Sequence, residues 1–297
     1  MDLRAIGMGL AFALMWSSAF TSARIIVAAA PPLTTLSLRF FLSGLLAVLI
    51  ALALKQSFRL TRAQWGATVL FGICQNALYL GLNFVAMQTV EASLAAIIAS
   101  TMPLVVGLFG WLVLREKIGP TGQIGLVLGV VGVVVIMGSR LQAGVDLWGV
   151  LLCVIGVLAL AFATLALRSA SSGGNVMAVV GLQMLIGGAC LAVLGAPFES
   201  WEVDWSWQLV AAFIYTTLVP GLAATFVWFV LVERIGAVRA ATFHFLNPVF
   251  GVAIAAVLLG EALTPRDVVG VLIVTLGILL VQLARGSAKS PHSSSEP

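Results

Sequence analysis

"MPLVVGLFGWLVLREKIGPTGQIGLVLGVVGVVVI" (residues 102–136) and "NPVFGVAIAAVLLGEALTPRDVVGVLIVTLGILLV" (residues 247–281) follow one pattern. At a constant offset of 145 residues and without a gap, five proline, glutamate and glycine residues coincide over the 35 positions. The pairs are Pro103 with Pro248, Glu116 with Glu261, Pro120 with Pro265, Gly125 with Gly270 and Gly132 with Gly277. This recurrence indicates an internal repeat and predicts that the chain consists of two related halves.

The composition indicates that most of the chain faces lipid and not water. Of the 297 residues, 61% are hydrophobic and 9% are charged, and the mean hydropathy is +1.15. A soluble domain has about 25% charged residues, so these charges are too few to cover a water-facing surface. The net charge of +4 comes from basic residues dispersed between apolar runs, which argues against a nucleic-acid partner.

The apolar runs predict an all-α polytopic membrane protein. A membrane-spanning helix needs about 20 apolar residues, whereas barrel strands alternate over about ten, and the runs in this chain are long and uniformly apolar. Ten helices are expected, at residues 6–28, 32–54, 65–87, 93–114, 120–138, 147–169, 176–196, 207–232, 238–259 and 267–284.

The repeat divides these helices into two sets of five, residues 1–138 and 147–284, followed by a polar tail at 285–297 that we expect to be disordered. Because five is odd, the second set enters the membrane from the opposite side. Inverted repeats are typical of transporters that alternate between two access states around a site near the bilayer midplane.

Lysine and arginine predict the orientation, because cytoplasmic loops carry an excess of both. With the N-terminus inside, the inner loops hold ten of these residues and the outer loops hold two. The inner ones are Arg4, Lys55, Arg59, Arg62, Arg115, Lys117, Arg168, Arg234, Arg285 and Lys289, and the outer ones are Arg140 and Arg266. We therefore expect both termini to be cytoplasmic.

Pro103 and Pro248 lie inside helix-length apolar runs. A proline lacks the N–H of a helical residue and clashes with the carbonyl four positions back, so these prolines should free the carbonyls of Ala99 and His244. In lipid, a freed carbonyl needs another partner or a wet cavity. We interpret both prolines as hinges beside the site; the alternative is a pair of tolerated kinks without a role.

The two halves, each ending in Pro-(12 residues)-Glu-x-x-x-Pro and a glycine-rich helix, resemble the EamA family of the drug/metabolite transporter superfamily. The stretches "AFALMWSSAFTSAR" (11–24) and "PPLTTLSLRF" (31–40) resemble the first and second helices of that family. The resemblance implies a basket-like bundle in the bacterial inner membrane, with a central cavity lined by helices 1, 3, 4, 6, 8 and 9. It also implies export of amino acids, as in the aromatic-amino-acid exporter branch. The first helix of the second half lacks the Trp-Ser-Ser pattern of residues 16–18. The two halves are therefore not expected to contribute equally to the site.

The third expected helix carries the clearest set of candidate substrate-binding residues. Gln75, Tyr79 and Asn83 recur at every fourth position, with Asn76 beside them, and such positions share one helix face. Tyrosine offers an apolar ring with a hydroxyl, and the amides offer donors and acceptors, so this stripe suits an amphipathic zwitterion. The alternative is hydrogen bonding between helices without a substrate.

Other polar or aromatic residues in mid-span are further candidates, because such residues usually face the bundle interior. His244 and Asn247 precede Pro248, and for His244 the alternative is a satisfied core group. The remaining candidates are Trp16, Ser17, Ser18, Ser100, Thr101, Thr164 and Trp228. Serine and threonine in membrane helices often only pack, so each of them alone is a weak signal.

Arg24 and Arg39 lie within or at the edge of spans near the expected outer side. Arginine at mid-membrane costs about 2.5–3.5 kcal/mol on insertion scales, and both side chains could extend outward to the interface. The alternative is that one of them attracts a substrate carboxylate at the outer mouth of the cavity.

No nucleotide-binding motif is present, and the three cysteines and two histidines have no metal-ligand spacing. We therefore expect no cofactor, no metal and no enzyme activity, although a channel remains an alternative. The expected function is export of neutral amino acids by a monomer that binds small molecules within the lipid bilayer. No acidic residue lies in mid-span, which favours facilitated diffusion over proton antiport.

The charge bias makes a prediction about topology. Green fluorescent protein fused after Pro297 should fluoresce, and alkaline phosphatase fused at the same place should be inactive, because we expect this end in the cytoplasm. Active phosphatase with a dark fluorescent protein would reverse the orientation.

Overall fold

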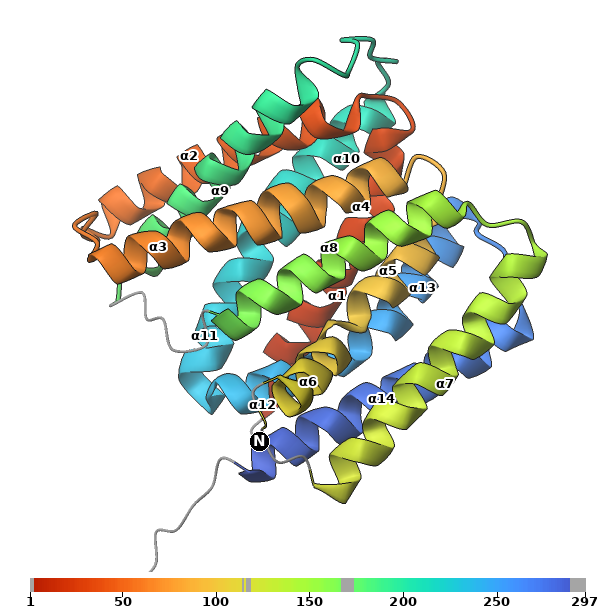
Figure 1. The fold of residues 1–297 in the computed structure, drawn as a ribbon. Coiled ribbons are helices and arrows are strands. Elements are labelled where there is room, and N and C mark those ends of the chain that lie inside the picture. Colours follow the sequence, from red (N-terminus) through yellow and green to blue (C-terminus); the bar gives the residue numbers. More distant parts are fainter. Residues whose placement is uncertain (1–2, 114, 116–118, 167–173, 289–297) are drawn as a thin grey trace, which may run out of the picture.

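The computed structural model describes residues 3–113, 115, 119–166 and 174–288, and Figure 1 shows their arrangement. Within these residues the chain is helical without a sheet, and ten stretches are long and apolar enough to cross a membrane. The prediction of an all-α polytopic membrane protein is confirmed, with span boundaries within a few residues of those expected. Glu116, Lys117, Arg168 and residues 289–297 lie outside the described part of the chain.

The two halves repeat the same order of elements. The first contains α1 (Leu3–Val27), α2 (Pro32–Ala53), α3 (Arg62–Phe71) with η1 (Gly72–Leu80) and α4 (Gly81–Ala86), α5 (Ala92–Ser100) with α6 (Met102–Leu112), and α7 (Pro120–Gln142). The second contains α8 (Leu147–Ala166), α9 (Val176–Gly195), α10 (Trp207–Leu218) with η2 (Val219–Ala223) and α11 (Ala224–Ile235), α12 (Ala237–Thr242) with η3 (Phe243–Leu246) and α13 (Asn247–Leu259), and α14 (Pro265–Ala288). The last helix continues past the expected boundary at residue 284.

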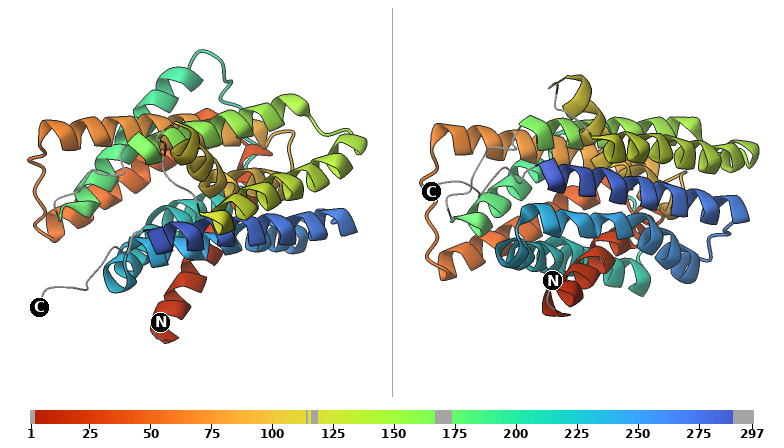
Figure 2. Two further views of the ribbon diagram at one scale, coloured as in Figure 1. Left: turned by 60° about the horizontal axis from the view of Figure 1, so that its bottom comes forward. Right: turned by 90° about the horizontal axis from the view of Figure 1, so that it is seen from below.

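Equivalent helices of the two halves pack against each other in pairs. Figure 1 shows α2 beside α9 on one side of the molecule and α7 beside α14 on the other, with α1 and α8 between the pairs. The views in Figure 2 agree that α7 and α14 lie together. The N-terminus and the end of α14 lie at the same end of the molecule (Figure 1).

Glycines at the α7–α14 contact show that the paired helices are antiparallel. A Cβ atom built on Gly125 would lie 2.7 Å from the Gly277 carbonyl oxygen, and one built on Gly132 would lie 2.9 Å from that of Gly270. Gly125 is equivalent to Gly270, and Gly132 to Gly277, at the offset of 145 residues. The two contacts therefore exchange under a two-fold rotation, as an inverted repeat requires.

The third span of each half contains a π-helical segment. The segment η2 covers residues 219–223, and the offset of 145 places these residues on 74–78, inside η1. The sequence similarity between the halves is too weak at these helices to show the correspondence. π-helical turns are rare overall but occur frequently at functional sites. Their recurrence in both halves therefore makes the third span of each half a candidate part of the functional site.

The fourth span of each half is interrupted just before its proline. Helix α5 ends at Ser100 and α6 begins at Met102, while η3 is a 3-10 turn that ends directly before α13. The expectation that Pro248 leaves the His244 carbonyl free is wrong, because the N–H of Asn247 donates to it. A 3-10 bond reaches three residues back and not four, so the tightened turn satisfies the carbonyl locally.

The antiparallel glycine contact predicts the effect of one added methyl group. Gly277→Ala should lower the free energy of unfolding by about 1–3 kcal/mol, because its Cβ would lie 2.7 Å from backbone atoms of both Gly125 and Gly129. Gly138→Ala in α7 is the matched control, since its Cβ meets nothing within 4 Å. Thermal unfolding in detergent measures both, and equal midpoints would contradict the close approach.

Candidate functional site

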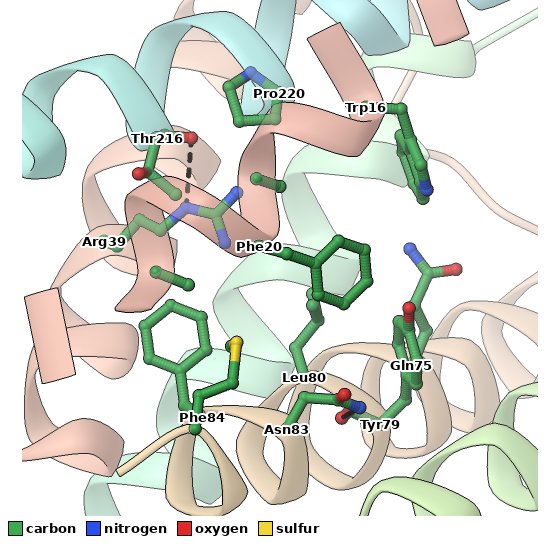
Figure 3. Close-up of a pocket in the computed structure, with 13 residues that line it drawn as sticks. Trp16, Phe20, Arg39, Gln75, Tyr79, Leu80, Asn83, Phe84, Thr216 and Pro220 are labelled. Carbon is green, nitrogen blue, oxygen red and sulfur yellow. Dashed lines mark hydrogen bonds between the residues drawn. The ribbon is translucent and has the colours of Figure 1, made fainter. Parts of the chain in front are cut away.

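A cavity lies among the first, second, third and eighth spans. Its lining includes Trp16 and Phe20 of α1, Arg39 of α2, Gln75 and Tyr79 of η1, Asn83 and Phe84 of α4, and Thr216 and Pro220 of the eighth span. Figure 3 shows these side chains around the shared space. The cavity therefore includes helix 2, which the resemblance did not imply, and none of the described residues of helices 4, 6 and 9 lines it.

The polar stripe of the third span faces this cavity. Gln75, Tyr79 and Asn83 all line it, and Tyr79 and Asn83 are almost fully buried. The Asn83 amide donates from Nδ2 to the Tyr79 carbonyl oxygen over 2.7 Å. Its Oδ1 atom has no hydrogen-bond partner within the described residues. An unpaired buried acceptor is costly, so the cavity wall offers a position for a donor from a ligand.

Asn76 points away from the cavity, although it is next to Gln75 in the sequence. Its Nδ2 donates to the Gln183 carbonyl oxygen of α9 over 2.9 Å. A Cβ atom on Gly187 would lie 2.3 Å from the Asn76 Cβ. Asn76 therefore joins two closely packed helices, which is the alternative that the sequence left open for the stripe.

Pro220 determines how Arg39 is held. A proline at this position cannot donate to the carbonyl four residues back, which is that of Thr216. The Arg39 Nε donates to this oxygen over 3.2 Å, as the dashed line in Figure 3 shows. Arg39 is 6% exposed and does not extend to an outer interface.

An aromatic cluster adjoins the cavity on the side of the N-terminus. Trp16, which also lines the cavity, lies near Phe12 and His244, and Trp228 lies 4.8 Å from Phe12 between ring centroids. His244 Nδ1 lies 3.0 Å from Asn247 Nδ2, and Ser17 donates to the Asn247 backbone oxygen over 3.3 Å. His244, Asn247 and Ser17 thus form one hydrogen-bonded group beside the aromatic rings.

The remaining hydroxyl candidates bond within or between helices. Ser18 shares a hydrogen bond of 2.7 Å with Tyr215, which ties α1 to α10. The hydroxyl groups of Ser100, Thr101 and Thr164 donate to carbonyls three or four residues back in their own helices. These residues lie outside the cavity lining, so the structure does not bring them together with the polar stripe.

The cavity is small in this conformation. Its volume is about 50 Å³, and one water molecule needs about 10–15 Å³ by this measure. Pockets for small organic ligands usually have about 300–1,000 Å³. A substrate of amino-acid size therefore requires the surrounding helices to move apart.

Glutamates cap helices at the distal end, which we define by the loops 28–31, 87–91, 143–146, 196–206 and 260–264. The Glu199 carboxylate accepts the N–H groups of Leu33 and Thr34 at the start of α2, both over 2.7 Å. The Glu261 carboxylate accepts those of Ala92 and Ser93 at the start of α5, over 2.7 and 2.9 Å. Free N–H groups and the helix dipole both favour an anion there. These contacts fasten loops of the second half to helices of the first.

Charged pairs reinforce the same end. Arg140 of α7 pairs with Glu91, and its Nε lies 3.3 Å from Asp267 Oδ1 of α14. Asp146 accepts a hydrogen bond of 2.6 Å from the Thr89 hydroxyl, and this bond lowers the pKa of the carboxyl. Arg24 donates to the carbonyls of Met87 and Gln88. Arg24 thus lies at the distal end and not in the cavity lined by the polar stripe.

Several apolar cavity residues carried no sequence signal. Phe20, Phe84, Met87 and Pro220 line the cavity, but in an apolar chain such residues also fill the core. Pro220 is the exception: a proline in mid-span frees a specific carbonyl, and this signal could have identified it.

The sequence profile of the EamA-like transporter family matches residues 3–138 and 147–283. The chain belongs to this family. It is therefore a multi-pass membrane transporter of the drug/metabolite superfamily and not an enzyme, which confirms the resemblance seen in the sequence.

Relatives of the family cover nearly the full chain. An "Uncharacterized transporter YvbV" of Bacillus subtilis is 27% identical over 93% of this chain and 91% of its own length. An "Uncharacterized inner membrane transporter YedA" of Escherichia coli is 26% identical over 93% of this chain and 90% of its own length. A solved structure, titled "Crystal structure of protein", has a TM-score of 0.66 and 21% identity over 98% of this chain and 100% of that one. It supports the EamA fold.

The Arg140–Asp267 pair predicts a loss of stability on removing one partner. The side chains are 10% and 1% exposed, but Asp267 keeps hydrogen bonds from Thr264 and Ser139, so Arg140→Gln should lower the free energy of unfolding by about 1–3 kcal/mol, less than the cost of a buried charge left without any partner. Adding Asp267→Asn should recover part of this loss. Thermal unfolding of the single and double variants measures the coupling, and additive losses would contradict it.

Proposed function

We propose that the protein is an inner-membrane carrier that exports neutral amino acids, with aromatic and other apolar ones favoured, by alternating access and facilitated diffusion. The supporting observation is the cavity, in which Gln75 and Asn83 offer polar atoms beside the rings of Trp16, Phe20 and Tyr79. The unpaired Asn83 Oδ1 suits an N–H donor such as an ammonium group.

Alternating access is supported by the contacts between the two halves at the distal end and by the inverted repeat. The contacts of Glu199, Glu261 and Arg140 join the two halves there. Since the halves are related by a two-fold rotation, an exchange of their conformations would exchange the access that the two ends of the molecule give to the cavity. The positive-inside bias would make the distal end periplasmic, with both chain termini in the cytoplasm.

Facilitated diffusion is supported by the charges of the cavity. The lining includes no aspartate or glutamate within the described residues, and proton-coupled carriers commonly use such groups. The second candidate is export of other small metabolites or drugs by proton antiport. It is favoured by His244, whose bonded network with Asn247 and Ser17 adjoins the cavity through Trp16.

The carrier proposal predicts counterflow in proteoliposomes. Labelled L-phenylalanine should enter faster when unlabelled L-phenylalanine is present inside, because a carrier returns loaded and a pore does not. Tyr79→Ala should lower this rate about tenfold, as the loss of about 1.4 kcal/mol of substrate contact would. Thr164→Ala is the matched control, since its hydroxyl donates to the Leu160 carbonyl in its own helix.

The same assay separates the alternatives. An imposed pH gradient should leave the rate unchanged, and a gradient-driven rate lost in His244→Ala would instead support proton antiport. Uptake without trans-acceleration would identify a channel. No uptake of any amino acid by folded protein would contradict the amino-acid substrate.

A further inference from the structure

Arg39 holds a positive charge inside the cavity, well away from the ends of its helix. It is the eighth residue of α2 (Pro32–Ala53), which places its Cα about 10 Å along the helix from the first residue. Figure 3 shows its guanidinium directed into the space between Pro220, Phe20 and Phe84. A charge in this position is costly unless it is paired.

The contacts of Arg39 leave its charge without a counter-ion. Its Nε donates to the Thr216 carbonyl, and its Cζ lies 5.1 Å from the ring centroid of Phe40. Among the residues that the structure describes, no carboxylate lies within ion-pairing distance of Arg39. A carbonyl and an aromatic ring orient the guanidinium, but neither neutralises it.

The guanidinium of Arg39 belongs to the lining of the cavity, as Figure 3 shows. With Nε engaged by Thr216, the N–H groups of both Nη atoms remain for a ligand. A guanidinium presents such donors in a planar fork that matches the two oxygens of a carboxylate.

We propose that Arg39 is the carboxylate-binding residue of the central cavity and that the transported substrates are monocarboxylates with an apolar body. The rings of Phe20, Phe84 and Tyr79 would surround that body. Arg39 is the one lysine or arginine among the described lining residues. A single cation matches one negative charge, so a phosphate dianion fits this site less well.

The inference rests on the proposed function, because it concerns the same cavity, but the two can fail separately. It requires a carboxylate and not an amino group. An amino acid and a simple carboxylic acid both satisfy the Arg39 site, whereas an amine does not.

Isothermal titration of the purified full-length protein with three matched probes tests the proposal. The probes share a phenyl ring and differ in their charged groups. L-Phenylalanine carries an amino group and a carboxylate, 3-phenylpropionate carries only the carboxylate, and 2-phenylethylamine carries only the amino group. The two carboxylates should bind the wild type at least about tenfold more tightly than the amine, since hydrogen bonds to charged groups contribute about 1.5–3 kcal/mol.

Variants of Arg39 then assign the effect to this residue. Arg39→Gln should weaken both carboxylates about 10- to 100-fold and should not weaken the amine, since it removes a like charge, while Arg39→Lys should lie between. Arg266→Gln removes an exposed arginine at the distal end and should change none of the three affinities. The comparison of probes on the wild type needs no variant to fold.

Three results would overturn the proposal: carboxylates that bind Arg39→Gln as tightly as the wild type, an amine that binds as tightly as the carboxylates, or no binding of either carboxylate. Binding of 3-phenylpropionate without L-phenylalanine would support the Arg39 site and contradict the amino-acid function. Equal binding of L-phenylalanine by wild type and Arg39→Gln would contradict the Arg39 site alone.

Discussion

Backbone N–H and C=O groups inside a bilayer have no water to bond, so each needs a partner within the protein. This constraint accounts for the helical spans and makes every interruption of a helix informative. At the eighth span, Pro220 leaves the Thr216 carbonyl without its helical donor, and Arg39 supplies the missing hydrogen bond. The hydrogen bond to the Thr216 carbonyl thus holds the Arg39 guanidinium at the cavity wall, where its two Nη atoms can donate to a ligand.

The inverted repeat supplies the symmetry for a change of access. Equivalent helices meet in antiparallel pairs, and the contacts of Gly125 with Gly277 and of Gly132 with Gly270 exchange under the two-fold rotation. The cavity is not symmetric, because α1 and α2 line it and no described residue of their counterparts α8 and α9 does. The two repeats can therefore exchange conformations, while the side chains that line the cavity stay the same in both access states.

The sequence predicted the spans and the two halves because length, hydropathy and the repeated prolines and glycines record them directly. It also placed Gln75, Tyr79 and Asn83 on one face, and all three line the cavity. It also grouped Asn76 with them, although adjacent residues of a helix do not share a face, and Asn76 bonds to α9. The depth of Arg39 was also hidden, since an arginine one-third along a span can bond inward or extend outward.

The most direct test of the account is whether one cavity position is reachable from both sides of the membrane. Ala19, which lines the cavity, would be changed to cysteine after Cys74, Cys153 and Cys190 are replaced. A membrane-impermeant thiol reagent is then applied to right-side-out and inside-out vesicles. The account predicts reaction in both, slowed by L-phenylalanine in both. Reaction from one side only, whatever the substrate, would contradict alternating access.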